Sequence, residues 1–139
     1  LPADVAIFAA AVADWAVTRP AEQKTKKDKS GVPQFALTEN PDILATIARR
    51  NAERPGLVIG FAAETENVIE HAREKLRRKG CDWIIANDVS PQTGIMGGDR
   101  NTVHLVTGKG VESWPPQSKT QVAQALVARI ATALAGAQR

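Results

Sequence analysis

The sequence predicts an α/β fold in which a mostly parallel sheet lies between layers of helices. Apolar runs without polar alternation recur along the chain, as in strands that are covered on both faces. Segments with helical spacing of apolar residues separate these runs, and such alternation favours parallel strands joined by right-handed crossovers. The chain has 139 residues, of which 43% are hydrophobic, so it is long enough for one domain with a real core.

The first predicted strand, Val5–Val12, leads into the most highly charged part of the chain. Asp14 closes the strand, and a carboxylate at the carboxyl end of such a strand lies where open α/β sheets bind ligands. Pro20 then stops regular structure. Four cations follow within six positions: Lys24, Lys26, Lys27 and Lys29. Such a cluster forms either a solvated loop, the usual role of a charge run, or a mobile flap that closes on phosphates.

A short strand and a helix start follow this lysine cluster. Gln34–Thr38 is predicted to be a strand after a turn at 30–33. Asn40 is predicted to be an N-cap, with Pro41 at the first helical position and Asp42 in the first turn. The start of a helix leaves backbone N–H groups free, so a routine cap and a role in ligand binding are both open here.

The segment Leu57–Ala63 is predicted to be a second buried parallel strand that runs into Glu64. Gly60 leaves room for another group to approach the backbone. Phe61 is either a core residue or an aromatic contact for a ligand at the carboxyl end of the strand.

The next helix, from about Asn67 to Arg78, carries a basic stripe. His71, Lys75 and Lys79 fall at successive i,i+4 positions and so share one face. Lys75 has no acidic residue three or four places away, and the only one near Lys79 is Asp82, beyond the predicted end of the helix, so the helix itself does not neutralise them. The sequence therefore predicts a compensating anion from elsewhere, with a solvated face as the alternative.

The remaining segments are predicted to supply a strand, a hairpin and a helix, with Asp88 as a candidate ligand group at the end of the strand. Trp83–Ala86 is a third parallel strand, and it ends at Asn87 and Asp88. Thr102–Val106 alternates as a half-exposed strand, and after a turn at 109–110 the segment Val111–Trp114 returns as its hairpin partner. His104 has no second ligand nearby, so a structural role is expected. The final helix, from Lys119 to about Leu134, serves packing, with Val127 among its apolar positions.

Composition narrows the class of protein. The formal charge of +3 and the pI near 9.3 suit an anionic substrate but are too small to indicate nucleic acid binding. The lone Cys81 excludes an intrachain disulfide and fits a reducing compartment. No stretch reaches the roughly 18 apolar residues of a membrane span, and the first residues given show no basic n-region followed by a cleavage signal. We therefore expect a soluble, cytoplasmic protein that binds neither nucleic acid nor membrane.

Four sequence motifs carry a family resemblance. The segment AAAVADW followed by KTKK, and then NPDI, GFAAET and ANDV in order, resembles the nucleotide end of bacterial phosphopantothenoylcysteine synthetase. The resemblance implies a Rossmann-like α/β/α fold with a C-terminal β-hairpin. It implies that residues 1–139 are a single partial domain, the nucleotide-binding portion, without the N-terminal part of the fold. Thr25 departs from the family pattern, which usually has an aliphatic residue there.

The resemblance implies an enzyme of coenzyme A biosynthesis. Members of this family use CTP to activate 4′-phosphopantothenate as an acyl-cytidylate, and L-cysteine then displaces CMP to form the amide. Mg²⁺ is implied with CTP, and a homodimer is implied. FMN is implied only if a decarboxylase domain lies upstream in the full-length protein.

The resemblance also assigns a nucleotide site and no metal ligands. Lys24 is the implied catalytic residue, because a flap lysine could reach the reacting phosphate as a point charge. The residues implied to surround CTP are Phe8, Ala9, Ala10, Asp14, Lys24, Asn40, Pro41, Asp42, Ile43, Phe61, Lys75 and Lys79.

Alternatives remain open. A nucleotide-binding fragment without activity of its own would carry the same motifs. A dinucleotide-binding oxidoreductase would share the fold, but GxGxxG is absent after every predicted strand. A nucleic-acid-binding module would use the lysine cluster, yet no aromatic residue lies between Lys24 and Lys29 for base stacking.

Overall fold

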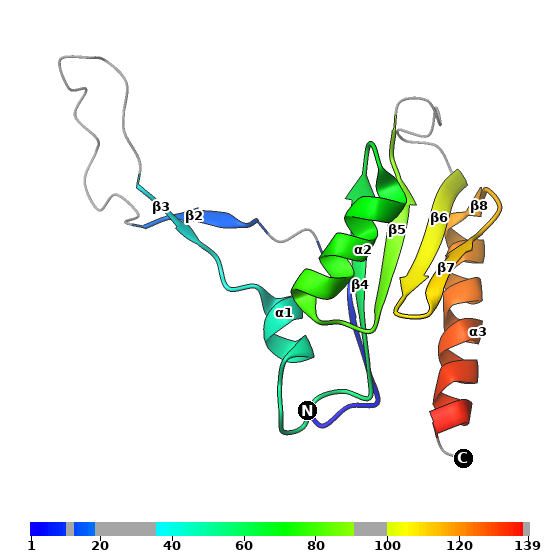
Figure 1. The fold of residues 1–139 in the computed structure, drawn as a ribbon, viewed down its shortest axis with the longest axis horizontal. Coiled ribbons are helices and arrows are strands. Elements are labelled where there is room, and N and C mark those ends of the chain that lie inside the picture. Colours follow the sequence, from blue (N-terminus) through cyan, green and yellow to red (C-terminus); the bar gives the residue numbers. More distant parts are fainter. Residues whose placement is uncertain (11–12, 19–35, 91–99, 138–139) are drawn as a thin grey trace. The chain divides into compact units, whose positions relative to one another are not determined.

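The computed structural model describes residues 1–10, 13–18, 36–90 and 100–137. The chain forms two compact units, which are described separately here (Figure 1). The larger unit comprises Leu1–Ala9 and Leu44–Arg139, and the smaller one comprises Ala10–Ile43.

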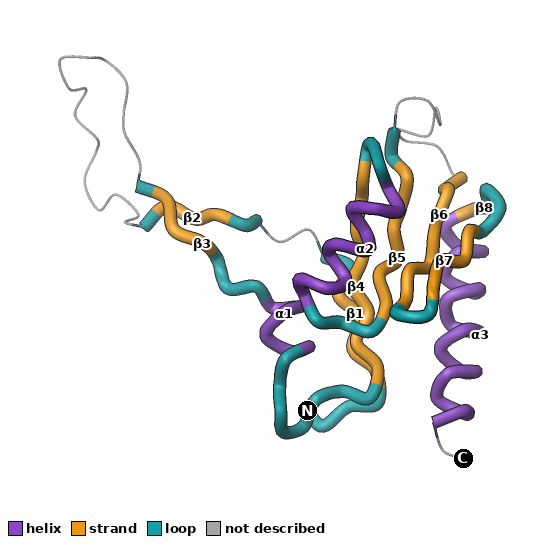
Figure 2. Tube along the Cα trace, viewed as in Figure 1, coloured by secondary structure: helices purple, strands orange, loops and turns teal. Residues whose placement is uncertain are grey.

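A mixed sheet forms the centre of the larger unit (Figure 2). Its main strands lie in the order β1-β4-β5-β6-β7, and a short strand β8 also pairs with β6. Strands β1, β4 and β5 are parallel, whereas β6, β7 and β8 are added antiparallel. The strands are β1 (Val5–Phe8), β4 (Leu57–Glu64), β5 (Trp83–Asp88), β6 (Arg100–Thr107), β7 (Gly110–Ser113) and β8 (Gln117–Ser118). The predicted mostly parallel core and C-terminal hairpin are confirmed.

Helices cover both faces of this sheet, which confirms the predicted three layers. The helices are α1 (Ile43–Ala48), α2 (Val68–Lys79) and α3 (Lys119–Ala137). One core cluster joins Val58 and Ala62 of β4 to α1 and α2, and the other joins Leu57 and Ile59 of the same strand to α3. Because successive side chains of a strand point to opposite faces, α1 and α2 lie on one side of the sheet and α3 on the other.

Strand β1 differs from its prediction. It ends at Phe8 rather than at Val12, although residues 11 and 12 lie outside the described part of the chain. Its side chains are only half-buried, and Ile7 is 48% exposed. In the described sheet β1 is an outer strand, so the predicted cover is only partial: Phe8 packs against the core cluster on one face and Val5 against the cluster on the other.

The space beside Gly60 is filled by the protein itself. A Cβ atom at this position would lie 2.6 Å from Cδ2 of Leu44 and 3.1 Å from Cδ1 of Ile84. The glycine therefore allows α1 to pack closely against β4. The group that approaches the backbone here is the side chain of Leu44.

Two helices depart from the sequence predictions, one in where it begins and one in which residues it buries. Helix α1 begins at Ile43, so Asn40 and Pro41 do not occupy its N-cap and first positions. In α3, Val127 is 64% exposed, because the core cluster on this face takes up the side of the helix that carries Val122 and Leu126. Helix α2 ends at Lys79, close to the predicted Arg78, and the φ of 74° at the following Gly80 lets its N–H bond to the carbonyl oxygen of Leu76.

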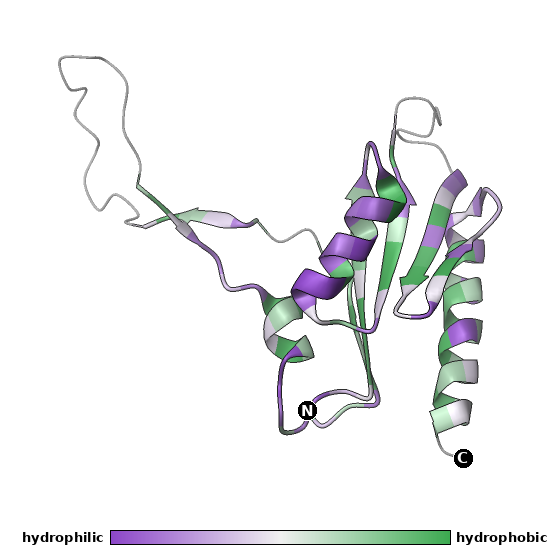
Figure 3. Cartoon of the chain, in the orientation of Figure 1, coloured by the Kyte–Doolittle hydropathy of each residue, from purple (hydrophilic) through white to green (hydrophobic). Residues whose placement is uncertain are grey.

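The smaller unit contains a two-stranded antiparallel ribbon of β2 (Trp15–Val17) and β3 (Leu37–Glu39). The predicted strand Gln34–Thr38 overlaps β3, whereas no strand was predicted at β2. Hydropathy is divided as expected for a layered protein, with hydrophilic residues along α2 and hydrophobic residues along the central strands (Figure 3). Within the described residues, no helix is long and apolar enough to cross a membrane.

Candidate functional site

The predicted site residues are distributed over both units. The larger unit holds Phe8, Ala9, Phe61, Lys75 and Lys79. The smaller unit holds Ala10, Asp14, Asn40, Pro41, Asp42 and Ile43. Lys24, the predicted catalytic residue, lies outside the described residues, as do the other lysines of its cluster.

The carboxyl ends of β4 and β5 form one polar edge in the larger unit. Glu64 is in register with Asp88, and the N–H of Val89 donates to the carbonyl oxygen of Glu64 at 3.0 Å. The carboxylate of Asp88 in turn accepts a hydrogen bond from the N–H of Ser90 at 2.9 Å. These contacts fix the strand ends at the edge where open α/β sheets bind ligands.

The side chain of Glu64 holds two members of the basic stripe of α2. One carboxylate oxygen lies 3.4 Å from Nδ1 of His71, and the other lies 4.0 Å from Nζ of Lys75. Lys79 also has an interaction partner within the protein. The prediction that an anion compensates Lys75 is thus met by a strand residue of the protein itself. This partner could not be found from i,i+3 and i,i+4 spacing within the helix, because Glu64 belongs to β4.

The two phenylalanines of the predicted site point to opposite faces of the sheet. Phe8 is in register with Gly60 and packs with the cluster below α1 and α2. Phe61 follows Gly60 and packs with the cluster below α3. Both rings are only half-buried. A ligand that contacts the ring of Phe61 would therefore meet the segment around Phe8 through its backbone, not through the phenylalanine side chain.

Asn87 lies in the ANDV motif but is not among the predicted site residues. Its Oδ1 is buried and has no hydrogen-bond partner among the described residues. Asn87 is in register with Ala63 of β4 and Val103 of β6, so it lies on the same face as Phe61. A buried acceptor without a partner costs about 1–3 kcal/mol, and a ligand donor at this edge would remove that cost. The signal in the sequence was the position of Asn87 at the end of a strand.

The smaller unit brings Asn40 and Asp14 together. The backbone N–H of Asn40 donates to the carbonyl oxygen of Asp14 at 2.8 Å, and its side-chain Nδ2 donates to the carbonyl oxygen of Ala13 at 2.7 Å. Asn40 thus fixes the backbone at the start of β2 instead of capping α1. The side chains of Asp14 and Asp42 lie at exposed positions.

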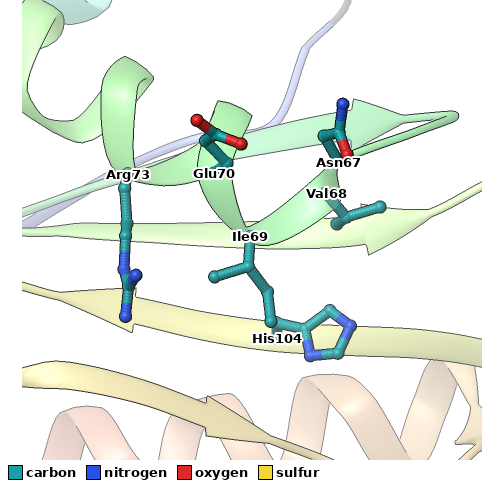
Figure 4. Close-up of a pocket in the computed structure, with 6 residues that line it drawn as sticks. All are labelled: Asn67, Val68, Ile69, Glu70, Arg73 and His104. Atoms are coloured by element: carbon teal, nitrogen blue, oxygen red, sulfur yellow. The ribbon is translucent and has the colours of Figure 1, made fainter.

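A shallow pocket lies elsewhere on the larger unit, between α2 and β6 (Figure 4). Its volume is about 520 Å³, and its lining residues are Asn67, Val68, Ile69, Glu70, Arg73 and His104. In the close-up Ile69 extends toward His104, while the carboxylate of Glu70 points away from it. Nδ1 of His104 lies 2.8 Å from Oγ of Ser113 across the hairpin, which agrees with a structural role. The pocket contains none of the predicted site residues.

The described residues contain no metal-ligand cluster. No three His, Cys, Asp or Glu side chains in that part of the chain come close enough to hold an ion together.

Comparison with known proteins gives a consistent family. The sequence profile of the family described as "DNA/pantothenate metabolism flavoprotein C-terminal domain" matches residues 1–134. The coenzyme A biosynthesis bifunctional protein CoaBC of Haemophilus influenzae is 41% identical over 124 residues, which cover 89% of this chain and 30% of that protein. The protein of the same name from Mycobacterium tuberculosis is 41% identical and is covered to 34%, with 96% of this chain included.

A solved structure has the same fold. The crystal structure of the C-terminal domain of the coenzyme A biosynthesis bifunctional protein CoaBC superimposes with a TM-score of 0.69 at 32% sequence identity. The superposition covers 96% of this chain and 58% of that domain. Of the two curated relatives from Haemophilus influenzae and Mycobacterium tuberculosis, by contrast, the chain spans only about a third of the length.

Proposed function

We propose, because this chain belongs to the family of DNA/pantothenate metabolism flavoprotein C-terminal domains, that it forms the nucleotide-binding part of a phosphopantothenate–cysteine ligase. One observation carries the proposal. Relatives named for coenzyme A biosynthesis match it at about 40% identity over 89% to 96% of its length. That share of the chain extends through the strand ends where Phe61, Glu64 and Asn87 lie.

The proposed reaction has two steps. A carboxylate oxygen of 4′-phosphopantothenate attacks the α-phosphorus of CTP, and the bond to the bridging oxygen of the β-phosphate breaks. Pyrophosphate leaves, and an acyl-cytidylate remains. The amine of L-cysteine then attacks the acyl carbon, CMP leaves with the bonding electron pair, and the ammonium proton passes to solvent. The products are 4′-phosphopantothenoylcysteine, CMP and pyrophosphate.

The residues of this chain serve the nucleotide in the proposal. Lys75 projects from α2 beside Glu64 and binds phosphate oxygens, because a cation near the carboxyl edge of the sheet is suited to the charge of CTP. Lys79, the last residue of α2, is the second proposed phosphate contact. Lys24 meets the charge that develops on the departing pyrophosphate. Phe61 and Asn87 face the same side of the sheet, where a flat base can contact the ring and donate to the unpaired Oδ1.

The smaller unit and the metal complete the proposal. Ala10, Asp14 and the segment Asn40–Ile43 contact CTP through backbone and polar groups. Mg²⁺ would bind with the triphosphate and neutralise part of its charge. The described residues contain no cluster of three His, Cys, Asp or Glu side chains that could hold the ion, and the proposed steps require none. The active species is a homodimer, and sedimentation of the complete natural polypeptide at high concentration tests this. A monomer there would contradict it.

The test of the ligase is direct. The complete natural polypeptide is incubated with 4′-phosphopantothenate, L-cysteine, Mg²⁺ and CTP, and pyrophosphate, CMP and the amide are measured. Omission of cysteine should leave a single turnover of pyrophosphate and an acyl-cytidylate that mass spectrometry detects. ATP, dATP and an oligonucleotide are then tested as competitors of labelled CTP.

The competitors separate the proposal from its alternatives. CTP should bind more tightly than ATP, and the oligonucleotide should not compete. Equal use of ATP would contradict the CTP assignment, and displacement by the oligonucleotide would favour a nucleic-acid-binding module. Nucleotide binding without amide formation by the complete polypeptide would contradict the ligase activity itself.

A further inference from the structure

We propose that Glu64 is a positioning residue, which holds the Lys75 ammonium group at the carboxyl edge of the sheet in readiness for the phosphates of the nucleotide. The inference rests on the proposed function, and it adds a residue to which that function assigns no part. It concerns only the larger unit, in which β4 and α2 are packed against the same core cluster.

Glu64 is itself held firmly. It is the last residue of β4, its carbonyl oxygen accepts the N–H of Val89, and its side chain is only 21% exposed. His71 lies 3.4 Å from one carboxylate oxygen, which restricts rotation of the carboxylate. The backbone of Glu64 is thus held in the sheet and its carboxylate is held by His71, so this carboxylate can in turn restrain a second side chain of α2.

The contact between Glu64 and Lys75 is long enough to orient the ammonium group without binding it tightly. The Nζ atom lies 4.0 Å from Oε1 of Glu64, at the outer limit of an ion pair, and Lys75 is 28% exposed. At this distance the carboxylate attracts the ammonium group without occupying its N–H donors closely. A long, flexible lysine side chain otherwise loses substantial rotamer freedom when it binds a ligand. Because Glu64 already restrains the Lys75 side chain in the free protein, less rotamer freedom remains to be lost when the nucleotide binds.

A merely structural contact would tie β4 to α2 and do nothing more. In that case the removal of Glu64 would lower stability, and its effect on CTP would not depend on Lys75. If Glu64 is a positioning residue, its effect on CTP must depend on Lys75, since Glu64 acts on the nucleotide only through the Lys75 ammonium group. A double-mutant cycle separates the two.

The experiment uses the complete natural polypeptide with Glu64→Gln, Lys75→Ala and both changes together, and CTP is varied at saturating levels of the other substrates. Glu64→Gln keeps the size and an acceptor oxygen but removes the charge. We expect the KM for CTP to rise roughly 3-fold to 10-fold in Glu64→Gln, with kcat within about 2-fold. In the Lys75→Ala background the same change should have no further effect on KM. Glu74→Gln, at an exposed position on the same helix, is the matched control and should leave both constants unchanged.

A second measurement does not use the nucleotide. Limited acetylation with acetic anhydride, followed by peptide mapping, gives the modification rate of Lys75 relative to Lys109, which is exposed in the β6–β7 turn. Lys75 should react more slowly than Lys109 in the parent, and Glu64→Gln should reduce the difference, whereas Glu74→Gln should not.

The outcomes distinguish the inference from the function on which it rests. If CTP binds and Lys75→Ala raises KM, but Glu64→Gln has its full effect in the Lys75→Ala background, the positioning role is wrong and the proposed function stands. A lower KM in Glu64→Gln would show that the carboxylate competes with phosphate for Lys75, and it would also overturn the inference. If the parent polypeptide does not bind CTP, the proposed function fails, and a remaining difference in acetylation would leave only a structural contact.

Discussion

Arg54 and Asp82 form an ion pair that ties together the amino ends of two parallel strands. Nη2 of Arg54 lies 3.1 Å from Oδ2 of Asp82, and the same carboxylate oxygen accepts the N–H of Val58 at 2.7 Å. Nε of Arg54 also donates to the carbonyl oxygen of Ala48 at 2.6 Å, at the end of α1. The network lies at the opposite end of β4 from Glu64, so it supports the sheet without belonging to the candidate site.

Substitution of Arg54 should test this support. Arg54→Met keeps most of the side-chain stem but leaves the carboxylate of Asp82 and the carbonyl oxygen of Ala48 with fewer partners. Because both charged groups are partly exposed, solvent will compensate part of the loss, and we expect the free energy of unfolding to fall by about 1–3 kcal/mol in urea titrations. Arg50→Met is the matched control, since the Arg50–Glu53 pair is more exposed. Its effect should stay below about 0.5 kcal/mol, and equal effects would contradict the distinction.

Gly60 should not tolerate a side chain, although alanine is common in strands of this kind. A methyl group would lie 2.6 Å from Cδ2 of the partly buried Leu44 and 3.1 Å from Cδ1 of the buried Ile84, so these side chains would have to move. We expect Gly60→Ala to lower the free energy of unfolding by about 1–3 kcal/mol. Gly108→Ala, where no atom lies within 4 Å of the added Cβ, should change it by less than about 0.5 kcal/mol. A neutral Gly60→Ala would show that Leu44 moves aside freely.

The sequence predicted the central strands because their apolar runs are long and free of polar residues, as at Leu57–Ala63. It did not predict β2, because the three residues Trp15–Val17 are too few to show a period, and their pairing with Leu37–Glu39 spans the lysine-rich segment. It placed Val127 in the core because helical spacing does not show how wide a face the sheet can cover.

The candidate site was predictable only where local sequence carries the information. Lys75 was identified from its place on a helix, but its partner Glu64 comes from a strand, and such pairs depend on tertiary packing. Asn87 was passed over for a similar reason, because an unpaired acceptor becomes visible only when the neighbouring strands are in place. The role of Lys24 stays a prediction, since this residue lies outside the described part of the chain.

Burial should make Cys81 a source of instability in alkaline solution. Burial raises the pKa of the Cys81 thiol from 9.0 to about 11. Above pH 9 the thiol ionises in the unfolded chain while it stays protonated in the folded one, so the free energy of unfolding falls as pH rises from 9 to 11. Between pH 8 and 10.5 the loss should be about 2 kcal/mol greater in the parent than in Cys81→Ala.

The comparison with Cys81→Ala removes other titrations. The chain has no tyrosine, and its lysines are the same in both proteins. Urea unfolding at the two pH values gives the difference. Parallel changes in parent and variant would show that the thiol ionises equally in the folded and unfolded states.

The lysines should separate binding from catalysis. Lys75 and Lys79 lie on α2, a rigid element, so they should contact phosphates alike in the ground state and the transition state, and their replacement by alanine should mainly raise the KM for CTP. If Lys24 meets the charge on departing pyrophosphate, Lys24→Ala should lower kcat by roughly 10²-fold or more with little change in CTP affinity. Steady-state kinetics with CTP varied and a separate assay of pyrophosphate release measure both, with Lys109→Ala as the control. An unchanged kcat in Lys24→Ala would assign the lysine cluster to a solvated loop, because a cation that stabilises the leaving group cannot be removed without cost to that step.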